Sequence, residues 1–217
     1  MITPKIKVLH SHGWQYIPDL NAVELTEEFR GRPELTATAD MRDVEAAAKL
    51  CPVKAITSAP FTLDLGKCLF CGECALRAPK NIRFINDYKI ASASREALVI
   101  KPGDEKVEFH PELVRPEIPK LFGQALKLRQ VSAAGDASVE MELNASGNVN
   151  FDFGRYGVEF VASPRHADGV VITGPISKNM AEALDICYHS IPEPKLVIVC
   201  GSEACSGGLF SESKAVN

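Results

Sequence analysis

The run CLFCGEC, from Cys68 to Cys74, constrains this chain more than any other feature of its sequence. Its three cysteines have the spacing C-x2-C-x2-C, which allows three thiolates to surround one iron–sulfur cube while backbone amides of the loop point toward the sulfurs. A [4Fe–4S] cube takes four protein ligands. The run therefore predicts three ligands and requires a fourth from elsewhere in the chain.

The dipeptide Cys51-Pro52 resembles the end of a bacterial ferredoxin motif. In ferredoxins with two clusters, the run C-x2-C-x2-C-x3-C-P gives three ligands to one cluster, and its last cysteine binds the other cluster. This resemblance implies that Cys51 ends a first, degraded motif and completes the site that begins at Cys68. We therefore predict one [4Fe–4S] cluster with four ligands: Cys51, Cys68, Cys71 and Cys74.

The positions without cysteine follow a pattern of their own. The three earlier positions of the first motif hold Met41, Val44 and Ala47. We expect these three to share one helix face and to fill the space of a lost cube. The last position of the second motif holds Ala78. All four ligands of one cluster are thus absent and all four of the other are present, which resembles a two-cluster ferredoxin domain reduced to one cluster.

Other occupants of the four-cysteine site stay open. C-x2-C pairs also suit a structural zinc ion in an all-thiolate site, but a third cysteine at the same spacing is more typical of iron–sulfur. A vacant or oxidised site is the third alternative. The seven cysteines are odd in number and no export signal is evident, which disfavours a disulfide framework. We expect the remaining three to be small buried residues or incidental thiols and not ligands: Cys187, Cys200 and Cys205.

The first half of the chain is predicted to form a small α+β domain of the ferredoxin-like type. Short strand-like segments alternate with the helical segment DVEAAAKL. A polar stretch over 103–110, followed by three prolines, marks a boundary. We predict an N-terminal arm over 1–34 that begins with strand-like KIKVLH, a single-cluster domain over 35–105, and a second domain over 106–217.

The second half is predicted to be an α/β domain. The segment KLFGQALKLRQV, 120–131, has near-helical apolar spacing and predicts an amphipathic helix. Further on, strand-like GVEFVA and GVVITGP precede the helical SKNMAEALDICYHSI and the strand-like KLVIVCG. A strand, a crossover helix and a second strand are typical of a parallel sheet that is covered on both faces.

The stretch from Phe151 to Leu184 resembles the small, electron-transferring subunit of membrane-bound [NiFe] hydrogenases, including that of formate hydrogenlyase. It equally resembles the related 20 kDa subunit of respiratory complex I. Its most specific part is SPRHAD, Ser163 to Asp168, followed by a strand that ends in Thr173-Gly174-Pro175. The resemblance runs from about Lys127 to Phe210. It implies a flavodoxin-like fold with a doubly wound, mainly parallel sheet, and a proximal [4Fe–4S] cluster beside a large catalytic subunit.

The residues at the family's ligand positions depart from this resemblance. When the family's Glu-x-Glu segment is aligned with Glu140 to Glu142, its paired cysteines fall on Asp136 and Val139. A third ligand falls on Glu203, and the fourth would lie beyond a domain that we expect to be truncated at its C-terminus. The resemblance therefore implies that the proximal cluster ligands are lost. Two carboxylates are thin grounds for a hard cation in their place.

Two residues of the SPRHAD segment have two readings. Arg165 and His166 either tune a nearby cluster or contact a partner subunit, as the resemblance implies, or they serve as structural hydrogen-bond donors.

Composition excludes several other classes. With 24 basic and 28 acidic residues among 217, the formal charge of -4 argues against nucleic acid as a partner. No apolar run approaches the roughly 20 residues of a membrane helix, and the N-terminus lacks the features of a secretory signal. We therefore expect a cytoplasmic protein that is peripheral on the cytoplasmic face of a membrane complex through its partners.

These observations predict an iron–sulfur electron-transfer subunit of a hydrogenase-like or complex-I-like oxidoreductase, with a hydrogenase-like large subunit among its partners. No acid–base pair or activated nucleophile is evident, so no catalytic residue is predicted and the chain is not expected to catalyse a reaction alone. The alternative is a docking, scaffold or redox-sensing protein with a structural cluster. A third reading, an enzyme with a ligand near Gly174 or Gly201, lacks the G-x-G-x-x-G motif of nucleotide binding.

Overall fold

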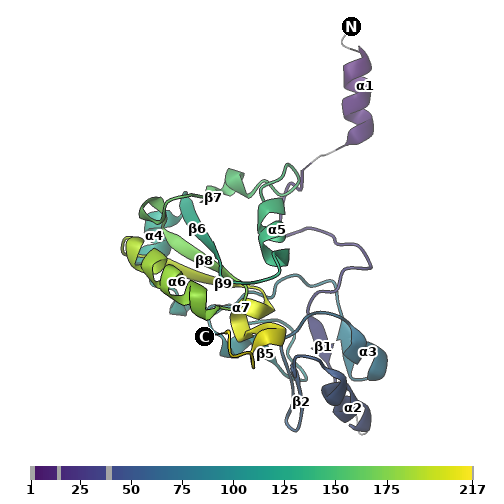
Figure 1. Cartoon of the computed structure of the whole chain (residues 1–217). Helices are drawn as coiled ribbons and strands as arrows, with labels where there is room; N and C mark the ends of the chain where they lie inside the picture. The colour runs from purple at the N-terminus through teal and green to yellow at the C-terminus, as the bar shows by residue number, and fades with distance from the viewer. Residues whose placement is uncertain (1–2, 14–15, 38–40, 217) are drawn as a thin grey trace.

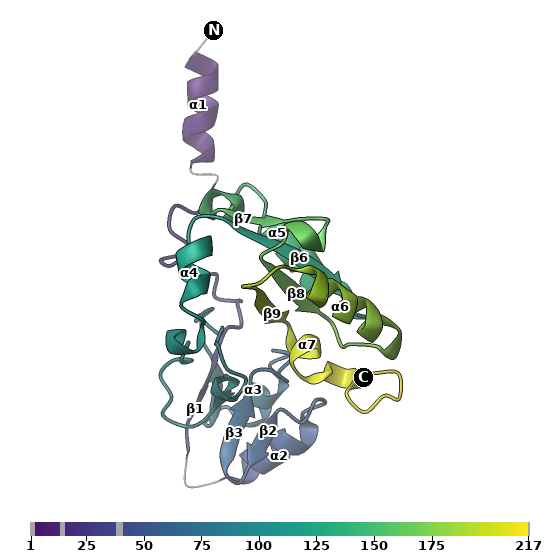
Figure 2. The ribbon, with the colours of Figure 1, turned by 90° about the vertical axis from the view of Figure 1, so that its left-hand side faces the viewer.

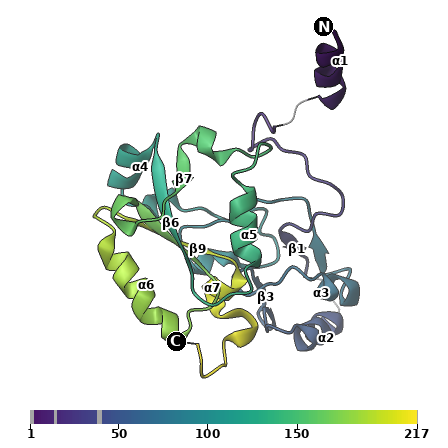
Figure 3. The same cartoon turned by 45° about the horizontal axis from the view of Figure 1, so that its top comes forward.

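The structure of the chain is a computed structural model that describes all residues except 1–2, 14–15, 38–40 and 217. The chain forms two bodies that lie against each other, an α+β body from the first hundred residues and an α/β body from the C-terminal part (Figure 1). The helix α1 (Thr3–His12) projects away from both bodies in every view (Figures 1, 2 and 3).

Short strands form two small antiparallel sheets in the N-terminal body. In one sheet, β1 (Pro33–Leu35) pairs with β4 (Ile82–Phe84). In the other, β3 (Phe61–Asp64) is central and lies between two neighbours, β2 (Ile56–Ser58) and β5 (Val99–Ile100). Two helices pack against each other beside the sheets, α2 (Arg42–Leu50) and α3 (Glu73–Arg77). The predicted α+β organisation is confirmed.

The strand–helix–strand pattern occurs twice in this body, first as β1-α2-β2 and then as β3-α3-β4. The outer strands of the two units pair with each other, and so do the inner strands. Cys51 is the C-cap residue of α2, and Ala78 is the C-cap residue of α3. Cys51 and Ala78 occupy the last cysteine position of the two sequence motifs, and they therefore also occupy equivalent places in the fold.

The two helices differ because only the second unit has cysteines in front of its helix. α2 has 9 residues and α3 has 5. Val44 and Ala47 are fully buried on the inner face of α2, and Met41 packs against the same core. The predicted shared face is confirmed. Apolar side chains at these positions pack directly into the core. The first unit is therefore helical over the segment that is a cysteine-containing loop in the second unit.

The C-terminal body is built on a parallel four-stranded sheet. Its spatial order is β7 (Val158–Phe160), β6 (Leu126–Ser132), β8 (Gly169–Thr173) and β9 (Leu196–Cys200). In the sequence order of this sheet alone the arrangement is 2-1-3-4, as in the first four strands of flavodoxin-like sheets. The predicted parallel α/β sheet is confirmed, and β8 and β9 are joined by the crossover helix α6 (Lys178–Ser190).

Helices cover both faces of this sheet. Val131, Val170 and Ile172 point to one face and pack against Met180 and Leu184 of α6. Thr173 points to the opposite face because side chains alternate along a strand, and there it contacts α5 (Ser138–Ala145). The helix α7 (Ser202–Ser206) follows β9. In the part of the chain that the structure describes, the remaining elements are 3-10 helices: η1 (Glu96–Leu98), η2 (Pro111–Leu113), η3 (Phe153–Tyr156), η4 (Pro164–His166) and η5 (Gly208–Phe210).

The helix predicted over 120–131 is wrong. The helix α4 (Glu117–Phe122) ends before Gly123, and β6 begins at Leu126. Leu128 and Val131 are buried in the centre of the sheet, where parallel pairing with β7 and β8 satisfies the backbone on both sides. Tertiary pairing therefore overrides the weak helical spacing of this segment.

The strand predicted for KIKVLH is also wrong, since these residues lie in α1. A strand needs a neighbouring strand for its backbone hydrogen bonds, whereas a helix satisfies them internally, so a segment that projects from the body is better satisfied as a helix. Among the described residues, no helix combines the length and the apolar composition needed to cross a membrane.

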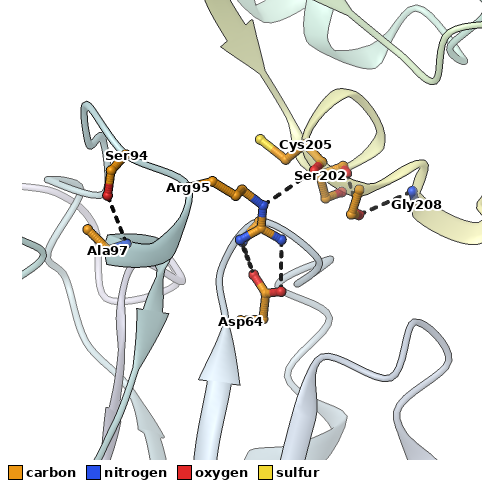
Figure 4. Close-up of polar contacts among 9 residues, drawn as sticks. Asp64, Ser94, Arg95, Ala97, Ser202, Cys205 and Gly208 are labelled. Atoms are coloured by element: carbon orange, nitrogen blue, oxygen red, sulfur yellow. Dashed lines mark hydrogen bonds and ion pairs between the residues drawn. The ribbon is translucent and has the colours of Figure 1, made fainter. Parts of the chain in front are cut away.

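Arg95 joins the two bodies. Its two terminal nitrogens donate to the carboxylate of Asp64 at 2.8 Å each, and its Nε donates to the carbonyl of Cys205 at 3.4 Å (Figure 4). Asp64 ends β3, and Cys205 lies in α7. An exposed ion pair between Lys54 and Glu212, 2.9 Å apart, also crosses between the bodies.

Candidate functional site

The four predicted cluster ligands line one pocket of the N-terminal body. Cys51 comes from the end of α2, Cys68 and Cys71 from the loop before α3, and Cys74 from α3 itself. Apolar side chains from three strands form other parts of the wall: Ile56, Leu63 and Phe84. The pocket has a free volume of about 20 Å³, so these side chains pack closely around it.

The four thiols differ in their access to solvent. Cys68 and Cys74 are buried, Cys51 is half-buried, and Cys71 is exposed. Cys68 and Cys74 belong to the same apolar core as Leu63. The pocket is therefore dry on its inner side, and Cys71 is the cysteine that meets the surface.

Backbone amides donate hydrogen bonds to the cysteine sulfurs. The amide of Ala55 donates to Sγ of Cys51, and the amide of Phe70 donates to Sγ of Cys68, both at 3.3 Å. Phe70 has φ 52° and Gly72 has φ 85°, so the loop between Cys68 and Cys74 turns twice through the left-handed region. Donors of this kind stabilise negative charge on sulfur and tune the potential of iron–sulfur clusters.

Burial keeps the inner thiols protonated in the absence of a positive charge. Burial raises the pKa of Cys68 to about 12, although the amide of Phe70 opposes the shift. Burial, together with Cys71 and Cys51, raises the pKa of Cys74 to about 11. Bound metal reverses this balance, because a coordinating thiol is deprotonated outright.

The spacing of the thiols differs from that of a site for one ion. Within the described residues, no three His, Cys, Asp or Glu side chains converge closely enough to bind a single metal ion. The thiolates that bind a cube attach to separate irons, so they surround the cluster and do not converge on one point.

The positions that the sequence resemblance aligns with ligands of a proximal cluster, Asp136, Val139 and Glu203, follow the carboxyl ends of β6 and β9. Glu140 and Glu203 carry carboxylates there, and Oε1 of Glu140 accepts a hydrogen bond from Thr173 at 2.6 Å. Burial, Asp136 and Glu140 together raise the pKa of Glu203. Val139 packs against Gly201, where a Cβ would lie 2.6 Å from its Cγ2. Carboxylates and a valine do not fit an iron–sulfur cluster, which takes thiolates.

The remaining cysteines do not join these carboxylates. Arg95 and Asp64 are the charged neighbours of Cys205, on the side of α7 that faces the N-terminal body. Cys200 is half-buried, and burial raises its pKa. Cys187 lies in α6 and packs against the core, but it is half-buried like Cys200 and Cys205, so the three are less buried than expected.

The residues of the SPRHAD segment lie at the opposite end of the sheet from the acidic group, which consists of Asp136, Glu140 and Glu203. Arg165 and His166 are exposed in η4, just before the start of β8, whereas Gly174 follows its end. Asp168 accepts a hydrogen bond from the amide of Lys127 at 2.7 Å and so ties the first residues of β8 to β6.

Sequence reasoning missed one residue beside the cysteine pocket. Nη1 of Arg30 donates to the carbonyl of Cys71 at 2.6 Å. The two residues are 41 positions apart, and no spacing motif links them. The pairing of β1 with β4 brings them together, because it places the N-terminal segment beside the second unit, to which Cys71 belongs.

Comparison with known proteins shows what the C-terminal body is similar to. Residues 137–217 match the family model described as NADH ubiquinone oxidoreductase, 20 Kd subunit. A subunit of the NADH-quinone oxidoreductase of Desulfovibrio desulfuricans is 47% identical over 76 residues, which cover 35% of this chain and 42% of the relative. A probable membrane-bound hydrogenase subunit of Pyrococcus furiosus is 32% identical over 101 residues, covering 46% of this chain and 60% of the relative.

A solved structure of an archaeal respiratory complex, the membrane-bound sulfane sulfur reductase, has one chain that aligns with a TM-score of 0.38 at 24% identity. The alignment covers 43% of this chain and 51% of that one. The chain spans about half the length of the curated relatives that it matches. The C-terminal body is thus a domain like the 20 kDa subunit, and the four-cysteine pocket lies outside the residues matched by the family model.

Proposed function

We propose that this chain is an iron–sulfur electron-transfer subunit that carries one [4Fe–4S] cluster in a complex-I-like or hydrogenase-like assembly. The observation that carries the proposal is that four cysteines, two of them 23 positions apart at Cys51 and Cys74, line a single pocket. We assign this site to a ferredoxin-like domain over 35–105, preceded by an arm over 1–34 and followed by the second domain over 106–217. The repeated strand–helix–strand units support this assignment.

A bound [4Fe–4S] cluster would supply one-electron redox chemistry at this site. The four thiolates would bind its irons, and the lining side chains would have to open around it, since the free volume is about 20 Å³. The amides of Ala55 and Phe70 donate to two of the sulfurs, and Leu63 excludes water from the inner side. Cys71 is exposed and is therefore the ligand nearest to a partner on this surface.

The C-terminal domain then serves as the docking half of the subunit. Asp136, Val139 and Glu203 stand at the positions that the resemblance aligns with ligands of a proximal cluster, and none of them offers a thiolate. We infer that the proximal cluster is lost and that this domain contacts a hydrogenase-like large subunit. The chain would reach a membrane complex, on its cytoplasmic face, through such partners.

Metal analysis of the anaerobically purified full chain tests the proposal. We expect about four irons and four sulfides per chain, negligible zinc, and one cubane-type EPR signal after reduction with dithionite. The double variant Cys68→Ala, Cys74→Ala should lose the iron. The matched control Cys187→Ala also removes a cysteine from a core, but at α6, and should keep the iron.

Each other outcome has a distinct meaning. About eight irons per chain would contradict the loss of the second cluster. One zinc and no iron would exclude electron transfer and leave a structural docking module. The acidic group in the C-terminal domain favours a docking function, because carboxylates in place of thiolates leave no second cluster for an electron relay. A chain without that relay is still able to dock. A cluster that cannot be reduced reversibly would likewise favour a structural or redox-sensing role.

A further inference from the structure

A groove adjoins the cysteine pocket on its outer side. Its volume is about 380 Å³, and it shares three wall residues with the pocket: Cys71, Gly72 and Phe84. α3 and the turn after it supply an apolar wall of Ala75, Leu76 and Pro79. Leu76 is 79% exposed, so its side chain is open to a ligand in the groove.

Two arginines provide the charge of this groove. Arg30 and Arg83 are both in its wall, and the described lining residues include no acidic side chain. Arg30 uses Nη1 for the carbonyl of Cys71, which is a neutral partner and leaves its positive charge uncompensated by that bond. Arg83 pairs with Glu34 at 2.6 Å through Nη2, and its side chain remains 73% exposed. A guanidinium has five donors, so both arginines have N–H groups left for a ligand.

We propose that this groove binds a small, planar, anionic organic molecule beside Cys71. The volume falls in the range of small-molecule pockets, roughly 300–1,000 Å³. An aromatic ring would pack on Leu76 and Phe84, and a carboxylate, sulfonate or phosphate group would accept hydrogen bonds from the arginines.

The proposed binding depends on the groove alone. Its meaning as a site for an electron carrier rests on the proposed function, because only a cluster in the adjoining pocket would make Cys71 a redox-active neighbour. A ring in the groove would contact the same residues that wall the cysteine pocket, Gly72 and Phe84. An electron carrier bound there would be in contact with the one exposed ligand of the site.

Equilibrium binding of anthraquinone-2-sulfonate tests the proposal, because this probe is planar, apolar and anionic. We expect saturable binding of one molecule per chain in calorimetric titration of the iron-loaded full chain. Arg30→Gln and Arg83→Gln should each weaken binding at least fivefold. Arg77→Gln removes the same charge from α3, where Arg77 pairs with Asp43 outside the groove, and should change the dissociation constant by less than twofold.

Three results would overturn the proposal. One is the absence of saturable binding, and another is equal weakening by Arg77→Gln, which would indicate general attraction by positive charge. The third is binding of hexaglutamate in place of the anthraquinone, which would identify an acidic polypeptide as the occupant. Iron content measured on the same samples separates the two proposals. Binding without iron contradicts only the proposed function, whereas iron without binding contradicts only the groove.

Discussion

Gly174 holds two loops of the C-terminal sheet in backbone contact at the edge where the acidic group lies. It has φ 73°, and a Cβ there would lie 2.3 Å from the backbone nitrogen of Gly135. Neither glycine offers a flexible side chain that could move aside. The close approach of these loops therefore requires glycine, and it fixes the ends of β6 and β8 relative to each other.

We expect Gly174→Ala to lower the free energy of unfolding by about 3 kcal/mol or more, since it combines a strained φ with a backbone clash. Urea denaturation followed by circular dichroism measures the change. Gly154→Ala is the matched control, because a Cβ at Gly154 would meet its nearest neighbour, Oδ1 of Asp152, at an ordinary 3.7 Å. Equal stability of the two variants would contradict the close contact.

The carboxylates of Asp136 and Glu140 lie near Glu203, so the contribution of Glu203 to the stability of the fold depends on pH. Burial, followed by the charges of Asp136 and Glu140, raises its pKa above the usual 4.5. A raised pKa in the folded state favours the protonated carboxyl, so this group loses stability as the pH rises from the unfolded pKa through the folded one. Glu203→Gln should therefore be more stable than the natural chain at pH 7.5, and the difference should shrink below about pH 4.

Thermal unfolding at the two pH values measures this effect. Glu182→Gln removes the same charge from the exposed side of α6 and serves as the control. Glu203→Gln should raise the midpoint at pH 7.5, and Glu182→Gln should not. A lower midpoint for Glu203→Gln at pH 7.5 would contradict a destabilising carboxylate at this position.

Among the elements, β3 and α7 are linked by Arg95, which connects the N-terminal and C-terminal bodies. The guanidinium holds the carboxylate at the end of β3 with two bonds and donates to the last turn of α7, where carbonyl groups lack helical partners (Figure 4). Asp64 also accepts hydrogen bonds at its carbonyl from the amides of Lys67 and Cys68. The same residue thus orients the cysteine loop and the joint between the bodies.

We expect Arg95→Met to lower the stability by about 1–2 kcal/mol, because a charge-assisted bidentate pair is lost at a partly exposed site. The two bodies should then unfold in separate steps, visible as two transitions in scanning calorimetry. Lys54→Met removes the other ion pair between the bodies. It should leave a single transition, since exposed pairs contribute little.

The elements also indicate how far sequence reasoning reaches. The spacing of Cys68, Cys71 and Cys74 is a local property of one loop and one helix start, and the ferredoxin resemblance added Cys51. All four line one pocket, and their role as cluster ligands stays a prediction. The strands β8 and β9 and the helix between them were predictable from apolar runs and helical spacing. The structure of residues 120–131 was not predictable in this way, because β6 is a strand only through its pairing with β7 and β8. Arg30 and Arg95 act on residues that are distant in sequence, and periodicity carries no information about such contacts.

At the scale of the whole molecule, the C-terminal sheet ends in an open edge. β9 pairs with β8 on one side, and no described strand pairs with its other side. Its sequence LVIVC has neither the lysine nor the proline that commonly protects an edge strand. Val197 and Val199 are 49% and 45% exposed and point to the same face.

This edge should promote self-association through antiparallel pairing of β9 with β9 of a second copy, because Val197 of one strand then meets Val199 of the other. We expect the natural chain to show a concentration-dependent increase in mass by sedimentation velocity between about 5 and 200 µM. Val199→Lys places a charge at the edge and should shift association to higher concentration. Val149→Lys makes the same change at an exposed valine outside the sheet and should have no effect. A monomer throughout this range, or equal association of both variants, would mean that the edge is protected within the chain itself.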